Sequence, residues 1–270
     1  MQGAPDEPER PSGLAFPRPV RGVHDRTACR GGLDVVHAGN LLKLPTTTLS
    51  LRWFYAILDN QQFINAFGLS ILLGVIAATF AILLAVPAAL ALSRYRFPGR
   101  DALVAFFLSP LIIPHVVLGV AFLRFFTQAG TTGSFAALLG SHILVIFPYG
   151  LRLVLASLTA SDPALERAAV SLGASNWTVF KRVVLPMMIP GVAGGWVISF
   201  IQSFDEVTMT VFVATPSSMT LPVRMYHYIE ESIDPLVASV STLVIFGTFL
   251  LMFVVDRIYG LDRMLVGPTK

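Results

Sequence analysis

The sequence predicts an all-α fold, a polytopic membrane helix bundle with five visible spans. Only 13% of the 270 residues are charged and 54% are hydrophobic, whereas a soluble domain carries about 25% charged residues. The mean hydropathy of +0.72 is that of a chain which crosses a membrane repeatedly. A membrane helix needs about 20 mainly apolar residues, and such windows lie at about 63–92, 102–126, 135–158, 189–214 and 236–258.

Proline inside these windows does not argue against helices, because neighbouring helices in lipid satisfy the freed backbone groups. The prolines concerned are Pro87, Pro110, Pro114 and Pro148. Small residues are frequent in the first and fourth windows, and they allow helices to approach closely. They include Gly74, Ala77, Ala78, Ala81, Gly194, Gly195 and Ser199.

The loops predict the orientation, because arginine and lysine gather on the cytoplasmic side of a membrane. The connections after the first and third windows are basic, and we place them in the cytoplasm. The connection at 128–134 is uncharged and the one at 215–235 is mainly acidic, so we place both outside. Basic residues after the fifth window put the C-terminus in the cytoplasm. The basic residues used here are Arg94, Arg96, Arg100, Arg167, Lys181, Arg182, Arg257, Arg263 and Lys270.

The ends of the chain differ from its middle. Residues 1–44 hold no apolar stretch and are rich in proline, glycine and arginine, so we expect a disordered or aberrant N-terminal segment. The transmembrane domain is expected at 45–264, followed by a cytoplasmic tail at 265–270. Five spans with a cytoplasmic C-terminus leave the N-terminus outside.

Composition excludes several kinds of site. The single cysteine, Cys29, excludes an internal disulfide framework and a multi-cysteine metal site. No Gly-x-x-x-x-Gly-Lys-Ser/Thr motif occurs, so the chain has no phosphate-cradling loop of its own. We expect no bound cofactor or metal, and the small net charge of +3 suggests no nucleic-acid partner.

A polar, amphipathic segment at about 160–187 separates the third and fourth windows. Asp162 and Pro163 predict a helix start, since proline is favoured in the opening turn. Gly173 permits the positive φ needed to turn between two short helices, and Ser175 is suited to cap the second helix. The apolar face of that helix is expected to hold Trp177, Phe180 and Val183.

This segment resembles the cytoplasmic coupling loop, or EAA loop, of permease subunits of ATP-binding-cassette (ABC) importers. The family pattern is Glu-Ala-Ala, three residues, Gly, nine residues, an aliphatic residue, one residue and Leu-Pro. Arg167 stands where the family has its glutamate, and Glu166 precedes it, so which of the two contacts an ATPase stays open. The expected coupling residues are Glu166, Arg167, Ala168, Ala169, Leu172, Gly173, Leu185 and Pro186.

The resemblance implies the type I ABC-importer permease fold and a multi-pass location in the bacterial inner membrane. It implies a transport subunit rather than an enzyme, with ATP used by separate nucleotide-binding subunits. A second permease subunit and a periplasmic solute-binding protein are the further expected partners. The family normally has a sixth span before Leu51, so we expect the first span to be missing, through a frame error, a wrong start or a truncation. The alternative is a natural five-span variant.

Two further stretches resemble the spermidine/putrescine group of these permeases, where they imply the second permease subunit. They are residues 94–100 (RYRFPGR) and 203–208 (SFDEVT). The second contains Asp205 and Glu206, which we expect in the outer half of the fourth span. Ionisable groups inside a membrane normally face a cavity or a partner. The sequence therefore predicts that these carboxylates border the path of a cationic amine.

Other interpretations remain. Asp205 and Glu206 would alternatively form a structural ion pair, with Arg124 or Arg152 as the partner, or lie high enough in the membrane to be wetted. Permeases for iron(III), thiamine, phosphonate or sulfate share the coupling loop, so the solute is open. A membrane-embedded enzyme is a remote alternative, since it would need a nucleophile and a base in reach of each other. The buried-looking His115 and His142 are interpreted as hydrogen-bonded packing residues.

Overall fold

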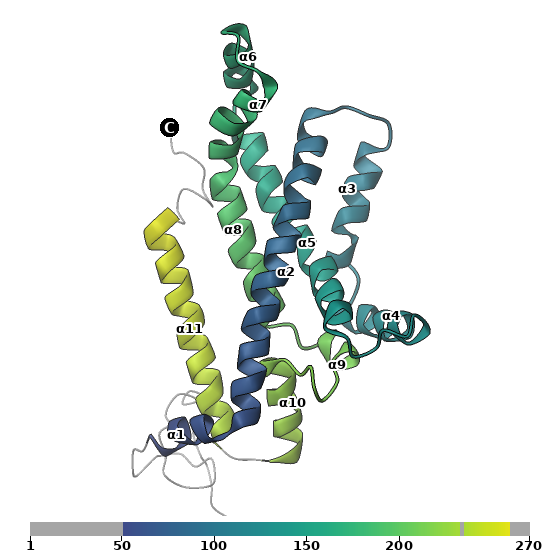
Figure 1. Cartoon of the computed structure of the whole chain (residues 1–270), viewed down its shortest axis with the longest axis vertical. Helices are drawn as coiled ribbons and strands as arrows, with labels where there is room; N and C mark the ends of the chain where they lie inside the picture. The colour runs from purple at the N-terminus through teal and green to yellow at the C-terminus, as the bar shows by residue number, and fades with distance from the viewer. Residues whose placement is uncertain (1–50, 233–234, 260–270) are drawn as a thin grey trace, which may run out of the picture.

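The computed structural model describes residues 51–232 and 235–259, which form an elongated bundle of helices (Figure 1). No strand occurs in these two ranges, and the all-α class is confirmed. The predictions for residues 1–44 and 265–270 lie outside the described residues. The helices are α1 (Arg52–Asp59), α2 (Gln61–Arg94), α3 (Arg100–Leu108), α4 (His115–Gln128), α5 (Phe135–Ala160), α6 (Pro163–Ser171), α7 (Asn176–Val179), α8 (Leu185–Phe204), α9 (Thr210–Val213), α10 (Leu221–Glu231) and α11 (Leu236–Tyr259).

Three long helices, α2, α5 and α8, pack against one another and form the centre of the bundle. Their contact faces carry small residues, as the sequence predicts. Gly150 of α5 and Gly195 of α8 both meet the Ile82 side chain of α2, where an added Cβ would lie 2.8 Å and 3.0 Å from its Cδ1 atom. Close approach of backbones therefore holds the three helices together.

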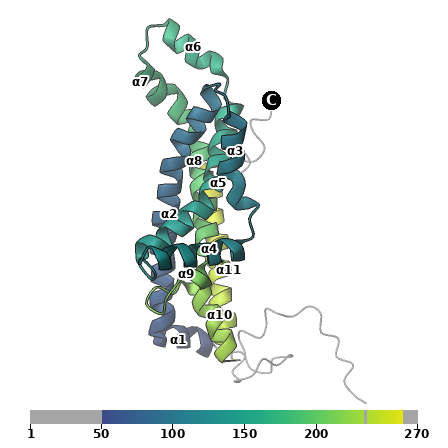
Figure 2. The same ribbon diagram turned by 90° about the vertical axis from the view of Figure 1, so that its right-hand side faces the viewer.

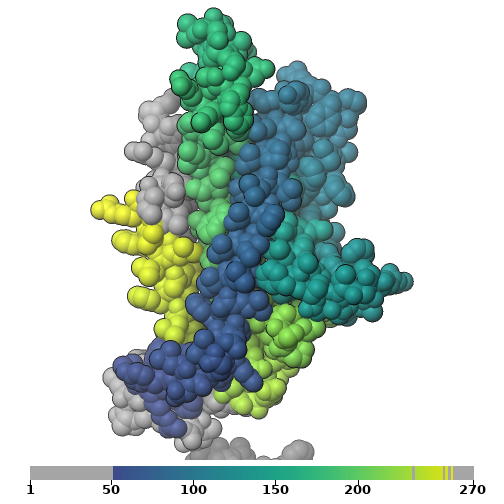
Figure 3. Space-filling view, viewed as in Figure 1, coloured from purple at the N-terminus to yellow at the C-terminus, as the bar shows by residue number. Residues whose placement is uncertain are grey.

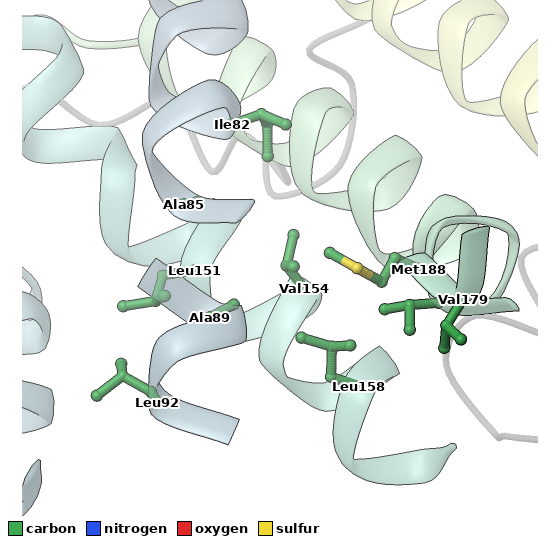
Figure 4. Packing of buried hydrophobic residues seen from close by; sticks show 10 residues of the cluster. Ile82, Ala85, Ala89, Leu92, Leu151, Val154, Leu158, Val179 and Met188 are labelled. Atoms are coloured by element: carbon green, nitrogen blue, oxygen red, sulfur yellow. The ribbon is translucent and has the colours of Figure 1, made fainter. Parts of the chain in front are cut away.

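The half of the bundle nearest α6 and α7 contains the largest apolar cluster (Figure 4). Leu92, Leu151, Val154, Leu158 and Met188 are almost fully buried there, at the meeting of α2, α5 and α8. Val179 of α7 joins the same cluster. The short helices at this end are thus anchored on the core helices by apolar contact.

The predicted second span is not one straight helix. It is divided into Arg100–Leu111 and His115–Gln128, and the two parts meet at an angle of 95°. Pro114 explains the break, because proline lacks an N–H and restricts the residue before it to extended conformations. As a result α4 projects sideways from the bundle (Figure 1).

The predicted fourth span is correct only as far as Phe204. The helix ends at Asp205, and a break separates it from the single turn of α9. In this break the Glu206 carboxylate accepts the Met209 N–H and lies against His115 of α4, which stabilises the chain outside a helix. In the described part of the chain three helices are long and apolar enough to span a bilayer, with the bent α3–α4 pair as a fourth and α11 apolar over the shorter stretch Leu236–Leu251.

Gly191 gives a test of the α5–α8 packing. A Cβ at this position would lie 2.5 Å from Ser157 Cβ and 2.7 Å from the backbone oxygen of Leu153. We expect Gly191→Ala to lower the free energy of unfolding by about 1–3 kcal/mol, since overpacking forces backbone shifts. Thermal unfolding of the purified protein measures it. Gly140→Ala in α5 is the control, because no atom lies within 4 Å of the added Cβ; equal melting temperatures for the two variants would contradict the packing.

Candidate functional site

The segment from Asp162 to Val184, called the tip from here on, projects beyond the ends of α2 and α5 (Figures 1 and 2). It contains α6, α7 and a π-helical turn (Phe180–Val184) that leads directly into α8. In the space-filling view it is the uppermost projection of the molecule (Figure 3). A projection of this kind is accessible to a soluble partner.

Local signals build the tip as the sequence predicts. The Asp162 carboxylate accepts a hydrogen bond from the Ala164 N–H at 2.8 Å and caps α6, with Pro163 as its first residue. Gly173 has φ +85°, and its N–H donates to the Val170 carbonyl. The following N–H, of residue 174, donates to the carbonyl of residue 169, which completes a Schellman motif. Ser175 Oγ then caps α7.

The two faces of α6 have different surroundings. Leu165, Ala168 and Leu172 share the outward face, where Leu172 is 89% exposed and Leu165 is 53% exposed. Ala169 is partly buried against the apolar cluster of the core helices. The predicted apolar group is therefore divided. Ala168 and Leu172 face outward, whereas Ala169 packs against the core helices.

Trp177 adds to the exposed apolar surface of the tip. Its side chain is 69% exposed and stacks on Phe180 with ring centroids 5.5 Å apart. The sequence predicts an apolar face here but does not show that the tryptophan would lie on the outside. Leu165 was not among the predicted coupling residues. Helical periodicity could have identified it, because Leu165 and Leu172 are seven residues apart and so share one face of the helix.

The predicted residues Leu185 and Pro186 begin α8, and both are exposed. One residue further on, the Met187 carbonyl accepts a hydrogen bond of 2.8 Å from Ser157 Oγ of α5. The start of α8 is thus tied to α5. The π-helical turn continues into α8 without interruption, so the tip and this helix are one continuous segment.

An ion pair ties the tip to α2. Arg94, the last residue of α2, donates from Nη2 to the Glu166 carboxylate of α6. Both side chains are about three-quarters buried, with 24% and 23% of their surfaces exposed. Arg167 is exposed, and it forms no ion pair with any residue the structure describes. Sequence spacing gives no indication of the Arg94 contact, because the partners lie 72 residues apart.

The two carboxylates of the second candidate region both lie in the break after α8, in different surroundings. Glu206 is buried: one oxygen accepts the Met209 N–H at 2.8 Å, and the other lies 2.6 Å from His115 Nδ1 of α4. Asp205 is exposed. The expectation that both lie within a membrane helix is wrong, since they follow its end. Glu206 pairs with a histidine and not with Arg124 or Arg152.

His142 forms a second buried link beside this break. Its two ring nitrogens lie 2.9 Å from Ser203 Oγ and 3.0 Å from Thr210 Oγ1, so α5 holds both sides of the break. Both histidines are hydrogen-bonded packing residues, as the sequence predicts. Neither belongs to a group of three or more potential metal ligands in the described ranges.

These features match a known family. Residues 70–261 match the family described as "Binding-protein-dependent transport system inner membrane component". The chain belongs to this family. It is a permease of the type predicted from the tip sequence, and the expectation of a transport subunit rather than an enzyme is confirmed.

Two individual relatives are permease proteins of polyamine transport systems. The permease is 31% identical over 212 residues to the spermidine/putrescine transport system permease protein PotC of Escherichia coli (strain K12), covering 78% of this chain and 80% of PotC. It is 29% identical over 220 residues to the putrescine transport system permease protein PotI of the same strain, with 78% of each chain covered. The resemblance to the polyamine group is confirmed at this level.

Solved structures confirm the fold of the permease. An inward-facing structure of the MetNI methionine ABC transporter aligns with a TM-score of 0.63 at 21% identity, covering 73% of this chain and 94% of that chain. The chain therefore has the fold of a type I ABC-importer permease.

Proposed function

We propose that this permease is a subunit of an ATP-driven importer that forms the transmembrane path for a small solute and couples to a separate ATPase through the tip. The observation that carries the proposal is the projecting α6, whose outward face presents Leu172 and Leu165 to the surroundings. Large exposed apolar side chains at the end of a projection are typical of a docking site.

The tip is connected to all three core helices. The chain joins α6 to α5 and, through α7 and the π-helical turn, to α8, while the Arg94–Glu166 ion pair joins it to α2. When ATP closes the ATPase dimer, the docked tip moves as a rigid body. The bundle then rocks between outward-open and inward-open states. ATP is used by the partner subunit, and this chain binds no cofactor.

The arrangement of basic residues supports a cytoplasmic tip. Arg94, Arg96 and Arg100 lie at the same end of the bundle as α6, and α11 runs toward this end with Arg257 in its last turn. α10 lies at the opposite end (Figure 1). We therefore place the tip and the C-terminus in the cytoplasm and α10 outside the cell, where a solute-binding protein delivers its cargo to this permease and a second one.

We infer that the solute is a polyamine, putrescine or spermidine. Two relatives named for these solutes support this class. Asp205 supports it chemically, because an exposed carboxylate at the outer end of α8 attracts a cationic amine. Iron(III), thiamine, phosphonate and sulfate remain the alternatives, and they differ from a polyamine in charge or size.

The decisive experiment measures ATP hydrolysis by the purified complex of this chain with its neighbouring gene products in lipid nanodiscs. Putrescine or spermidine with the binding protein is expected to stimulate hydrolysis, and sulfate is not. Stimulation by sulfate alone would assign the path to another solute. A complex that contains no ATPase subunit would contradict the permease–ATPase coupling itself.

Asp205 and Glu206 are expected to have different roles. Asp205→Asn removes the exposed carboxylate and should raise the KM for a polyamine roughly tenfold with little change in melting temperature, the effect of about 1.4 kcal/mol of lost attraction. Glu206→Gln weakens a buried contact to His115 and should lower the melting temperature instead. Transport kinetics and thermal unfolding of both variants separate the roles. Equal effects on KM would show that both carboxylates meet the solute.

A further inference from the structure

The charges of the tip are unequally accessible. Its sequence contains two acidic residues, Asp162 and Glu166, and three basic ones, Arg167, Lys181 and Arg182. Each acidic side chain is engaged within the chain, since Asp162 caps α6 and Glu166 binds Arg94. The three basic side chains are exposed. Asp162 is itself exposed, but the three exposed basic groups outnumber it, so the accessible charge of the tip is positive overall.

Of the three basic residues of the tip, Arg167 is the one that belongs to α6. It lies on the same helix as Leu165 and Ala168, whereas Lys181 and Arg182 belong to the π-helical turn where the chain enters α8. Arg94 pairs with the carboxylate of Glu166, the neighbour of Arg167, and that side chain is only 23% exposed. A partner that covers Leu172 and the adjoining side of α6 would thus meet the guanidinium group of Arg167 beside a carboxylate that is already paired.

We propose that Arg167 is a specificity-determining contact of this permease, and that its partner ATPase has an apolar groove with an acidic residue at the rim that receives Arg167. This rests on the proposed coupling function and adds the chemistry of the partner surface. Complementary charges at the edge of an interface steer association and exclude partners of the wrong sign. An ATPase with a basic residue at that place would be rejected by this chain.

The position of Arg167 favours a protein partner over the lipid surface. α6 is the part of the tip that projects furthest from the core helices (Figure 2). The basic residues nearest the membrane-entering helix are Lys181 and Arg182. These two are suited to anionic lipid headgroups, and Arg167 lies beyond them.

The test measures the dissociation constant between the purified ATPase subunit encoded beside this chain and the permease in nanodiscs. Arg167→Lys should bind as the native chain does, Arg167→Gln about threefold more weakly, and Arg167→Glu roughly tenfold more weakly at about 0.05 M salt. The differences should largely vanish at about 0.5 M salt, because salt screens exposed charges. Arg182→Glu is the matched control and should leave binding unchanged.

A charge-reversal search in the partner completes the test. Each Asp or Glu around the ATPase groove is changed to Lys and combined with Arg167→Glu, and at least one combination should restore binding. No restoration, or equal weakening by Arg182→Glu, would overturn the proposal. An effect of Arg167→Glu seen only in nanodiscs with phosphatidylglycerol would overturn it in favour of lipid. If Leu172→Asp leaves ATPase binding intact, the coupling function fails as well; if it abolishes binding while the Arg167 series shows no trend, only this inference fails.

Discussion

Leu172→Asp is expected to prevent the ATPase subunit from binding. The native side chain is 89% exposed at the end of α6, so the substitution costs the folded permease little. In the complex it would bury an unpaired carboxylate in an apolar groove. We expect the affinity to fall at least about 30-fold, as when an interface hot spot is removed, with loss of solute-stimulated ATP hydrolysis. Binding of the purified ATPase subunit to the permease in nanodiscs measures this.

The added charge needs a control in the same segment. Asn176→Asp places the same carboxylate at the exposed first residue of α7, where the helix N-terminus tolerates a negative charge. This variant should bind the ATPase nearly as well as the native chain. If both substitutions weaken binding equally, the tip responds to charge alone and Leu172 is not an apolar contact. Unchanged binding with Leu172→Asp would remove α6 from the interface.

Breaking the Arg94–Glu166 ion pair is expected to uncouple ATP hydrolysis from transport. The pair is the ion pair that joins the tip to α2, beside the apolar contacts of Val179 with the core cluster. Arg94→Glu or Glu166→Arg places two like charges together in a partly buried site. Each variant should still hold the ATPase through Leu172 but should lose roughly tenfold in transport per ATP hydrolysed, since about 1.4 kcal/mol is enough for that change.

The double variant with both charges exchanged distinguishes a specific pair from general damage. Arg94→Glu combined with Glu166→Arg should recover most of the coupling, because the attraction is restored with its sign reversed. Arg96→Glu is the matched control on the same connection, since Arg96 is exposed. Coupling that is lost in the exchanged variant, or lost equally with Arg96→Glu, would contradict a role for this pair in transmitting motion.

The features predicted correctly from the sequence are those with local physical causes. The start of α6 follows from Asp162 and Pro163, and its end follows from Gly173. The long helices α2 and α5 follow from apolar windows of sufficient length. In each case the signal and the structure lie within the same few turns, so one sequence is enough.

The features missed depend on contacts between distant residues. The break after Phe204 is stabilised by Glu206 and His115, which lie 91 residues apart, and hydropathy extends the helix across it. The bend at Pro114 is another example. Pro87 and Pro148 lie inside the continuous helices α2 and α5, and the sequence-based predictions treat these two prolines and Pro114 alike. Proline in a membrane helix is compatible with a continuous helix as well as with a break, because neighbouring helices can satisfy the freed backbone groups.

The local construction of the tip has a consequence for how such transporters diversify. The turns and caps of the tip are determined by its own residues. A segment of this kind can be exchanged between permeases with few changes in the helices that surround the solute. The specificity for an ATPase subunit and the specificity for a solute can therefore evolve independently. Arg94 on α2 and the apolar cluster beneath Val179 are the exceptions, because they lie outside the tip and yet hold it in place. If residues 162–184 were grafted into another permease, an arginine equivalent to Arg94 would have to be introduced as well.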